Sequence, residues 1–504
     1  MSTYITTSIH YCNAREHCGH IYEVILADFI KKQFELLGQN VKLMTGTDEH
    51  GKKIQSTAEK QNKLPKEFCD EMVVHFINMN KKYQVDYDHF IRTTDDYHMK
   101  LVQDCIVKVF VNSDIYKGEY KGYYSVREET FIPEESAKLT DYKDPLTNLP
   151  YEYLSEESYF FKMSKYLPKI KEVINSIYPL KYQQEITERL NKLDELKDLS
   201  ISRTSFDWGI PFPNQIDNRH VMYVWFDALL NYVSGLNYMY NAKWPSPRGF
   251  AEKPEKIIHI IGKDIIWFHG VIYPAILNSC FNNYYPDKIL VHGFITDKDG
   301  KKMSKSLGNV ILPDDLDKYP VEAIRFYMLT ETNLGEDLKF SVERMMDKYN
   351  FTLIDDFGNL VQRLGNLCKD HITEINNLSL SESDDFIELI DAINNYDLLK
   401  YYGLVFNKIR ELNSFLNLEK PWEKNIDKNK KILVLKKCLY RLNIITKLMY
   451  PYIPNKIMDI RRIFGFSNGL NLNDNNIDDL NILFEKKQII FEQVDRREKA
   501  KNIK

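Results

Sequence analysis

Two histidines near the start of the chain have the spacing and setting of a phosphate-binding motif. His17 and His20 enclose Cys18 and Gly19, after a polar loop and before a run with helical spacing of apolar residues. A helix N-terminus attracts anions, and two imidazoles there could donate hydrogen bonds to a phosphate. Gly19 would let a nucleotide approach the backbone closely. The tetrapeptide alone also fits two unrelated neighbouring histidines, or an i,i+3 metal pair.

A lysine-rich segment much further along the chain offers matching chemistry. Residues 301–306 (KKMSKS) follow Gly300, so three lysines and two hydroxyls are expected in a loop. Ammonium groups offset the charge of β- and γ-phosphates, which makes a triphosphate the expected ligand. A near copy at 162–165 lies between Phe160 and Leu167, seven residues apart, as core positions of an amphipathic helix are. We interpret the copy at 162 as structural and the segment 301–306 as functional.

The first 45 residues contain the elements that would position the histidines. Residues 4–9 predict a strand, and residues 20–37 carry apolar side chains at helical spacing, ended by Gly38. Residues 41–44 predict a second strand. A strand–helix–strand unit of this length implies a parallel sheet.

The rest of the chain interrupts and then resumes this pattern. Residues 115–205 are tyrosine-rich and charged, with hairpin-like pieces at 116–118 and 122–124, and predict an inserted domain. Strand patterns that would continue the parallel sheet return at 221–224, 257–261 and 288–291. From about residue 345 the periodicity is helical, which predicts an all-helical C-terminal domain.

Composition narrows the class of protein. The 504 residues carry 68 Lys+Arg against 72 Asp+Glu and are 43% hydrophobic, which is enough for about three globular domains. A net charge of -4 argues against coating of nucleic acid by bulk electrostatics. We expect a cytoplasmic protein because no apolar run suits a membrane span or a leader. The seven cysteines include no C-x-x-C spacing, so we expect reduced thiols and no local thiolate zinc site.

Further motifs narrow the interpretation to one family. They are 45–51 (TGTDEHG), 208–211 (WGIP), 223–229 (YVWFDAL), 261–264 (IGKD) and 420–422 (KPW). Together with the H-x-G-H and K-M-S-K-S segments they resemble the methionyl-tRNA synthetases, which are class I aminoacyl-tRNA synthetases. The resemblance runs in order from about residue 4 to at least residue 425.

The resemblance implies an α/β fold class. A Rossmann-type parallel-sheet catalytic domain would be split by an inserted connective domain and followed by an all-α anticodon-binding bundle. The implied boundaries are 1–114 and 206–298 for the two catalytic halves, 115–205 for the insert, 299–345 for the phosphate-loop connector and 346–504 for the bundle.

The resemblance also assigns roles to residues. Catalysis would depend on His17, His20, Asp48, Arg203, Lys302 and Lys305. ATP would be bound by His17, Gly19, His20, Glu23, Gly262, Lys263, Asp264, Lys302, Met303, Ser304 and Lys305. Methionine would be bound by Ile9, Tyr11, Asp48, Trp225, Ala228, Leu229, Tyr232, Ile265, Phe268 and His269, with Tyr273 nearby. The anticodon would be read by Asn359, Arg363 and Trp422.

The implied reaction needs no covalent enzyme intermediate. The methionine carboxylate would attack the α-phosphorus of ATP, with Mg²⁺ accompanying the departing pyrophosphate, and a terminal hydroxyl of tRNA(Met) would then attack the adenylate. Aromatic walls suit a polarisable thioether, to which Tyr11 and His269 could offer a weak hydrogen bond. Ser125 and Glu128 stand where many relatives have zinc-binding cysteines, so we expect the zinc-free branch and no metal site. We also expect a monomer.

Two alternatives remain at this point. One is another class I synthetase, for a branched aliphatic amino acid or cysteine, although the insert of about 90 residues leaves little room for a large editing domain. The other is a tRNA-binding protein that has lost catalysis, against which the intact His17, His20, Asp48, Lys302 and Lys305 argue.

Overall fold

The protein is described here from a computed structural model. It describes residues 1–125, 130–132, 134–145, 147–193, 196–240, 254–281, 284–303, 309, 311–380, 382, 384–474, 477, 480–484 and 490–491. The chain forms two compact units. The first unit comprises Met1–Glu16, Lys42–Met79 and Tyr87–Val291, and the second comprises His17–Val41, Asn80–Asp86 and the chain from His292 onward.

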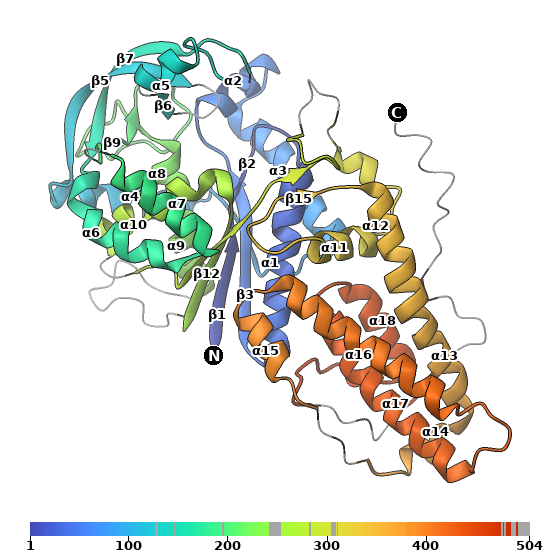
Figure 1. The fold of residues 1–504 in the computed structure, drawn as a ribbon. Coiled ribbons are helices and arrows are strands. Elements are labelled where there is room, and N and C mark those ends of the chain that lie inside the picture. Colours follow the sequence, from blue (N-terminus) through green and yellow to red (C-terminus); the bar gives the residue numbers. More distant parts are fainter. Residues whose placement is uncertain are drawn as a thin grey trace. The chain divides into compact units, whose positions relative to one another are not determined.

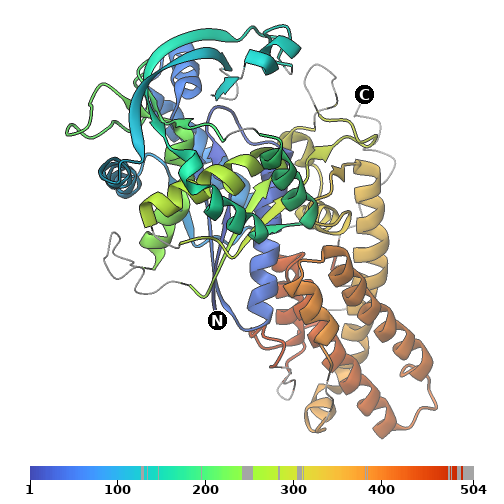
Figure 2. The ribbon, with the colours of Figure 1, turned by 60° about the vertical axis from the view of Figure 1, so that its left-hand side comes forward.

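The first unit is built on a seven-stranded sheet (Figures 1 and 2). Its order is β2 (His10–Tyr11), β3 (Asn40–Asp48), β1 (Ser2–Thr7), β12 (Lys256–Gly262), β13 (Lys288–His292) and β8 (Ile177–Tyr178), with β4 (His89–Arg92) on β3. The registers of β1–β12, β2–β3, β3–β4 and β8–β13 are all parallel. β12 is almost continuously apolar and buried, as a central parallel strand is. The predicted parallel α/β fold is thus confirmed.

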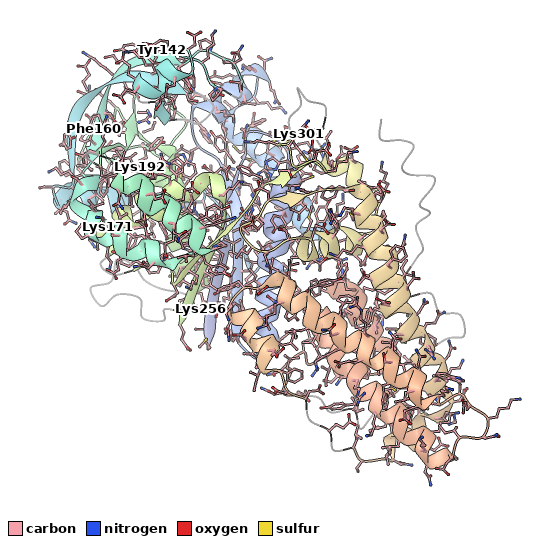
Figure 3. The ribbon with its side chains drawn as sticks, in the orientation of Figure 1. Tyr142, Phe160, Lys171, Lys192, Lys256 and Lys301 are labelled. Carbon is pink, nitrogen blue, oxygen red and sulfur yellow. The ribbon has the colours of Figure 1, made fainter. Side chains whose placement is uncertain are left out.

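Helices complete the first unit. They are α2 (Lys52–Lys60), α4 (Asp96–Val111), α5 (Glu134–Leu139), α6 (Leu167–Val173), α7 (Leu180–Asn191), α8 (Val224–Leu229), α9 (Asn231–Met239), α10 (Tyr273–Phe281), and α3 (Pro65–Lys82), which crosses into the second unit. Lys171 on α6 and Lys256 at the start of β12 are labelled in Figure 3.

An antiparallel sheet lies within the predicted insert. Its order is β6 (Thr130–Ile132), β5 (Ile115–Ser125), β7 (Glu152–Phe161) and β9 (Leu199–Ser200). β5 and β7 run side by side as long curved strands in both views (Figures 1 and 2). The two pieces predicted to be hairpin-like both lie in the single strand β5, which pairs antiparallel with β7 along its length and with β6 at Tyr123–Ser125. The range 115–205 also includes β8, which extends the seven-stranded sheet.

Two other sequence expectations are corrected in this unit. Val221 and Met222 form β11, which pairs antiparallel with β10 (Ser202–Arg203) in a separate two-stranded sheet, and Val224 already starts α8. The segment 162–165 is not in an amphipathic helix: Phe160 (Figure 3) belongs to β7 and Met163–Tyr166 is a 3₁₀ turn. Its structural role stands, since Met163 is buried and Lys165 forms an ion pair with Asp114.

The second unit is helical. It contains α1 (Cys18–Leu36), α11 (Val321–Thr330), α12 (Val342–Lys348), a π-helical segment (Tyr349–Gly358), α13 (Asn359–Cys368), α14 (Ile372–Asn376), α15 (Ile387–Asn394), α16 (Leu398–Glu419), α17 (Lys428–Met449) and α18 (Pro454–Phe464). A two-stranded sheet of β14 (Ile295–Thr296) and β15 (Leu338–Lys339) is also present. Both views show α16 and α17 lying along each other (Figures 1 and 2). Beyond residue 345 the described part of the chain holds no strand, as predicted.

Sequence features explain how α1 begins and ends. The His17 side chain caps its N-terminus, and Gly38 follows its C-terminus with φ at +75°, a conformation that glycine adopts without strain. Among the described residues, no helix has the length and apolar character needed to cross a bilayer. All seven cysteines are buried, and none of them forms a disulfide.

Candidate active site

The expected ammonium ligand of the first unit lies where two parallel strands end. β2 and β3 pair so that Tyr11 lies opposite Asp48. Ligands of open α/β sheets bind at this carboxyl edge. Asp48 is only 9% exposed, and Lys53 Nζ lies 5.5 Å from the centre of the Tyr11 ring. The structure therefore places Tyr11 and Asp48 side by side at the sheet edge.

Aromatic residues assigned to the methionine side chain form two pairs. Trp225 and Phe268 stack with ring centres 3.6 Å apart and planes inclined by 10°. The Tyr232 hydroxyl lies 2.7 Å from His269 Nε2, and the Ile265 carbonyl lies 3.0 Å from His269 Nδ1. A carbonyl only accepts, so Nδ1 carries a hydrogen and Nε2 of the neutral ring accepts from Tyr232. Because both ring nitrogens are engaged, His269 orients Tyr232, and a direct bond from His269 to the thioether is not supported.

A buried histidine supports the Tyr232–His269 pair. His259 lies under Tyr232, with ring centres 4.3 Å apart, and its Nδ1 is 2.8 Å from Thr6 Oγ1. Burial, followed by the neighbouring His269, lowers the pKa of His259 well below its usual value, so this ring is neutral. Three other residues were expected to contact methionine. Ala228 and Leu229 are buried in α8, and Ile9 packs against the hydrophobic core.

The expected adenosine ligands follow β12 directly. Gly262 ends the strand and is buried, Lys263 is half-buried and Asp264 is exposed in a short 3₁₀ turn. An exposed carboxylate just beyond a central parallel strand is well placed to accept hydrogen bonds from ribose hydroxyls.

Arg203 is held firmly in the first unit. Its Nη1 donates to Ser200 Oγ and to the Ser202 carbonyl, each at 2.8 Å, and its guanidinium lies 4.5 Å from the centre of the Tyr223 ring. Glu156 Oε1 is 3.6 Å from Arg203 Nε. The side chain is 2% exposed, so its direction is fixed by the protein itself.

In the second unit the paired histidines open α1. The Gly19 N–H donates to His17 Nδ1 over 3.1 Å, and the His17 N–H donates to His20 Nδ1 over 3.3 Å. The two rings stack with centres 3.7 Å apart. Since both Nδ1 atoms accept, each neutral ring carries its hydrogen on Nε2. The cap thus sets the tautomer in which two neighbouring N–H groups suit an anion.

Three neighbours of the histidines have structural roles. A Cβ atom at Gly19 would lie 2.9 Å from His17 Cε1, so a larger residue would push the His17 ring out of its present position. Cys18 Sγ donates to the Ile311 carbonyl at 3.0 Å, which connects the start of α1 to the segment that follows the lysine-rich loop. Glu23 is buried, with its Oε2 2.9 Å from His292 Nε2.

The base of the lysine-rich loop is a tight turn centred on Asp297. Its carboxylate accepts from the Lys301 N–H and from Asn309 Nδ2, each at 2.8 Å, and these bonds, Asn309 first, lower the pKa of Asp297. Gly300 in this turn has φ at +83°, and Lys301, the first residue of the lysine-rich segment, follows it directly (Figure 3). Lys302 forms a bridge to Thr296. Met303 is described, whereas Ser304 and Lys305 lie outside the described residues.

The expected anticodon residues gather at one place in the second unit. Asn359 is exposed at the start of α13, and Arg363 lies one turn further along the same helix. The Arg363 guanidinium lies 4.3 Å from the centre of the Trp422 ring and donates to Asn417 Oδ1 over 2.7 Å. Trp422 is 43% exposed after the buried Pro421. Such a cation–aromatic pair is a preformed surface for an unstacked base.

The structure also reveals polar residues to which the sequence assigned no role. Asp227 accepts hydrogen bonds from His50 and His98, and Asn417 orients Arg363. His50 and Asp227 lie inside recognised motifs, but nothing in the sequence indicated that they meet, because they are separated by 177 residues.

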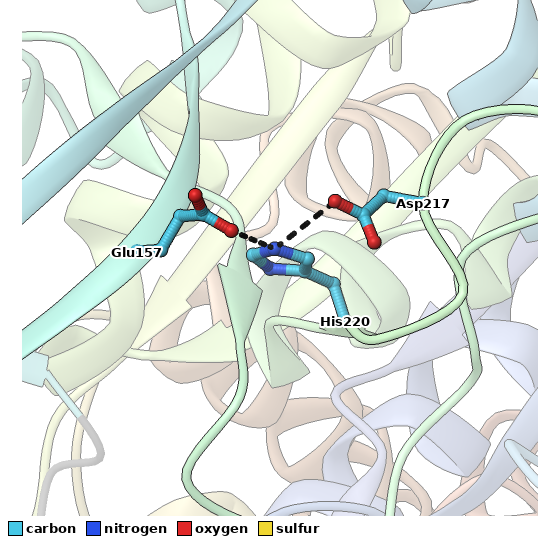
Figure 4. A group of neighbouring side chains, drawn as sticks. All are labelled: Glu157, Asp217 and His220. Carbon is cyan, nitrogen blue, oxygen red and sulfur yellow. Dashed lines mark hydrogen bonds and ion pairs between the residues drawn. The ribbon is translucent and has the colours of Figure 1, made fainter.

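One described cluster has the composition of a metal site. Glu157, Asp217 and His220 offer ligand atoms within 4.8 Å of one another (Figure 4). Lys117 Nζ lies 2.8 Å from both carboxylates, and Arg219 Nη2 lies 2.9 Å from Glu157 and 2.8 Å from Asp217. These two cations, Arg219 first, lower the pKa of Asp217. The carboxylates are thus neutralised by the chain itself, and the arrangement is a surface ion-pair network.

Comparison with known proteins identifies related chains. The family model "tRNA synthetases class I (M)" matches residues 3–141 and 135–365. The methionine–tRNA ligase of Thermotoga maritima is 37% identical over 84% of this chain and 68% of its own length, and that of a Nostoc species is 36% identical over 93% and 91%. A solved structure of Mycobacterium tuberculosis methionyl-tRNA synthetase in complex with methionyl-adenylate superposes with a TM-score of 0.81 at 29% identity, covering 93% of this chain and 94% of that one.

Motif order, fold and sequence identity over most of the chain therefore lead to one assignment. The chain belongs to the methionine–tRNA ligase family of class I tRNA synthetases.

Proposed function

We propose that this protein is a methionine–tRNA ligase. It activates L-methionine with ATP, as its magnesium complex, to methionyl-adenylate and pyrophosphate, and then transfers methionine to the 3′ end of tRNA(Met). The observation that carries the proposal is the sheet edge of the first unit. At that edge Asp48 lies beside Tyr11. Two aromatic pairs that suit a thioether, Trp225–Phe268 and Tyr232–His269, lie in or shortly after the family's motifs along the chain.

The first unit would bind the amino acid and the nucleoside. Asp48 attracts the methionine ammonium, which leaves the carboxylate to attack the α-phosphorus. Trp225 and Phe268 cover the side chain, and Tyr232, oriented by His269, places its hydroxyl oxygen in a fixed position. Asp264 binds the ribose, and Arg203 stabilises negative charge as the α-phosphorus becomes five-coordinate.

The second unit would stabilise the departing phosphates. The Nε2–H groups of His17 and His20 donate to phosphate oxygens, at an end of α1 where the helix dipole favours anions. Lys302 and Lys305 offset the charge that builds up on pyrophosphate. Catalysis would then consist of positioning the reactants and stabilising the developing charge, and no side chain acts as a nucleophile.

Anticodon reading would depend on Asn359, Arg363 and Trp422. A base of the CAU anticodon would stack on the exposed Trp422 face, while Arg363 and Asn359 donate to base edges. The chain is proposed to act as a monomer of the zinc-free branch. The buried Ser125 at the position of a zinc ligand, and the ion-paired Glu157–Asp217 cluster, support the absence of a structural zinc.

The decisive experiment is ATP–pyrophosphate exchange with each of the twenty amino acids, followed by charging of a tRNA(Met) transcript. We expect exchange with methionine alone and methionylation of the transcript. Exchange with an aliphatic amino acid or cysteine in its place would contradict the specificity. Absence of any exchange, with tRNA binding retained, would favour a tRNA-binding protein without catalysis. Stoichiometric zinc in the purified protein would overturn the zinc-free assignment.

A further inference from the structure

A buried carboxylate in the first unit accepts hydrogen bonds from two imidazoles. His50 Nδ1 lies 2.6 Å from Asp227 Oδ2, and His98 Nε2 lies 2.7 Å from Asp227 Oδ1. Asp227 is 1% exposed, His50 3% and His98 0%. The other ring nitrogen of His98, Nδ1, is 2.8 Å from Ser234 Oγ, which donates to the Leu230 carbonyl. Both carboxylate oxygens are thus used, and the chain of bonds continues into α9.

This network connects the two parts of the proposed methionine site. His50 follows the ammonium ligand Asp48 by two residues, at the end of β3. Asp227 follows Trp225 by two residues and directly precedes Ala228 in α8. Ser234 follows Tyr232 by two residues in α9. These hydrogen bonds therefore run from the segment that would hold the ammonium to the helices that would hold the thioether.

A second set of bonds fixes the same segment from its other side. Glu49, between Asp48 and His50, accepts from Arg92 Nε at 2.7 Å and Arg92 Nη2 at 2.8 Å, and from two threonine hydroxyls. Its own carbonyl accepts from Trp208 Nε1. With Glu49 held by Arg92 and His50 held by Asp227, the backbone at Asp48 has little freedom to shift.

The physical chemistry favours a positioning role over simple stabilisation. Well-packed apolar residues of similar size are often as stabilising as a buried ionic group, so stability alone does not require this network. Burial alone would raise the pKa of Asp227, yet the imidazoles, His50 first, hold the pKa below its usual value, so the carboxylate stays charged. A charged acceptor with two short, directional bonds fixes distance in a way that apolar packing does not.

We propose that Asp227, with His50 and His98, is a positioning residue that sets the distance between Asp48 and the thioether-binding helices α8 and α9. The network would thereby determine methionine affinity and the accepted side-chain length. The proposal rests on the proposed methionine site. It requires no contact of Asp227 with substrate.

The test compares Asp227→Asn with Asp114→Asn, measured by pyrophosphate exchange. Asp114 is a matched control because it is a buried carboxylate of the same unit, bonded to Lys165, Tyr166 and Ser279, outside the proposed site. In Asp227→Asn the KM for methionine should rise about tenfold or more, since one of two buried charged bonds is lost, while the KM for ATP changes less than about twofold. Asp114→Asn should lower the thermal midpoint and leave both KM values unchanged.

Ethionine, one methylene longer than methionine, tests the distance itself. The preference of kcat/KM for methionine over ethionine should fall by about fivefold or more in Asp227→Asn and stay unchanged in Asp114→Asn, because a pocket discriminates a methylene only while its length is fixed. His98→Gln, which keeps a donor toward Asp227, should show a smaller change and serves if Asp227→Asn folds poorly.

Two outcomes would overturn the inference. In one, Asp227→Asn has a lower thermal midpoint or fewer active sites, but its KM for methionine and its preference for methionine over ethionine equal those of the wild type. The other is a His98→Gln enzyme with the same pattern. Asp48→Asn separates the two proposals: if it too leaves the KM for methionine unchanged, the assigned methionine site itself is wrong.

Discussion

His17 shows how one side chain can serve both folding and chemistry. Its Nδ1 accepts the Gly19 N–H and so caps α1, and the same bond places the ring hydrogen on Nε2. His20 is set in the same tautomer by the His17 N–H. Two roles that are usually tested together can therefore be separated by substitution.

Asn is the substitution that separates them. Asn is also a good N-cap residue, so His17→Asn should keep the thermal midpoint while kcat for exchange falls about 100-fold, the loss typical when one donor to a developing anion is removed. His17→Ala should lose the same activity and, in addition, about 1 kcal/mol of stability. Exchange by His17→Asn at the wild-type rate would show that His17 acts only as a cap.

At the scale of elements, a buried ion cluster connects helices of the second unit. Arg325 on α11 is 0% exposed and lies 2.6 Å from Asp28 of α1, which also pairs with Lys32. The same guanidinium donates to the carbonyls of Tyr452 and Tyr83 at 2.9 and 2.7 Å. Burial tends to raise the pKa of Asp28, but Lys32 and then Arg325 outweigh it, so the pKa is lowered.

Removing that carboxylate should destabilise the second unit. Asp28→Asn leaves two cations buried without their anion, and we expect a loss of about 3–5 kcal/mol in the free energy of unfolding by denaturant. Asp459→Asn, which breaks an exposed pair with Arg462 on α18, is the control and should change it by less than about 0.5 kcal/mol. A small change for both would mean that Asp28 is not the counter-ion of the cluster.

The same variant has a defined pH dependence. A carboxyl whose pKa is lower in the folded protein stabilises it above the unfolded pKa and loses this contribution as the pH falls through the folded value. The difference in unfolding free energy between wild type and Asp28→Asn should be constant above about pH 5 and shrink once the pH falls below the ordinary value of 3.8. A difference that does not vary with pH down to acid unfolding would contradict this assignment.

At the scale of the whole molecule, the proposed function separates two activities. Amino acid activation would depend on residues at the sheet edge, at the start of α1 and in the lysine-rich loop. Anticodon recognition would depend on the Arg363–Trp422 pair between α13 and the loop after α16. The two sets share no residue.

Trp422 tests this separation. Trp422→Ala should raise the KM for tRNA(Met) in charging by about tenfold or more, because a base loses a stacking surface, while methionine-dependent exchange stays at the wild-type rate. Trp422→Phe keeps an aromatic ring under Arg363 and should lose less. Equal loss of exchange and charging in Trp422→Ala would refute the separation.

Local patterns were sufficient for the elements that have strong periodicity. The apolar run of β12 favours a central parallel strand, and the helical spacing of α1, ended by Gly38, favours a capped helix, as the structure has them. Short apolar stretches were ambiguous. Val221–Met222 has the composition of a core strand but pairs antiparallel with β10, because strand direction is set by the partner and not by the strand.

Motif residues lie close together along the chain, so the amino-acid sequence alone was enough to identify the family, the order of its motifs and the residue types available for chemistry. Which distant groups meet depends on the fold. Asp227 reaches His98 across 129 residues, Arg325 reaches Asp28 across 297, and Arg363 lies on Trp422. Tautomers, charge states and orientations follow from those meetings, because a hydrogen bond is defined by its partner, and the partner is supplied by the fold.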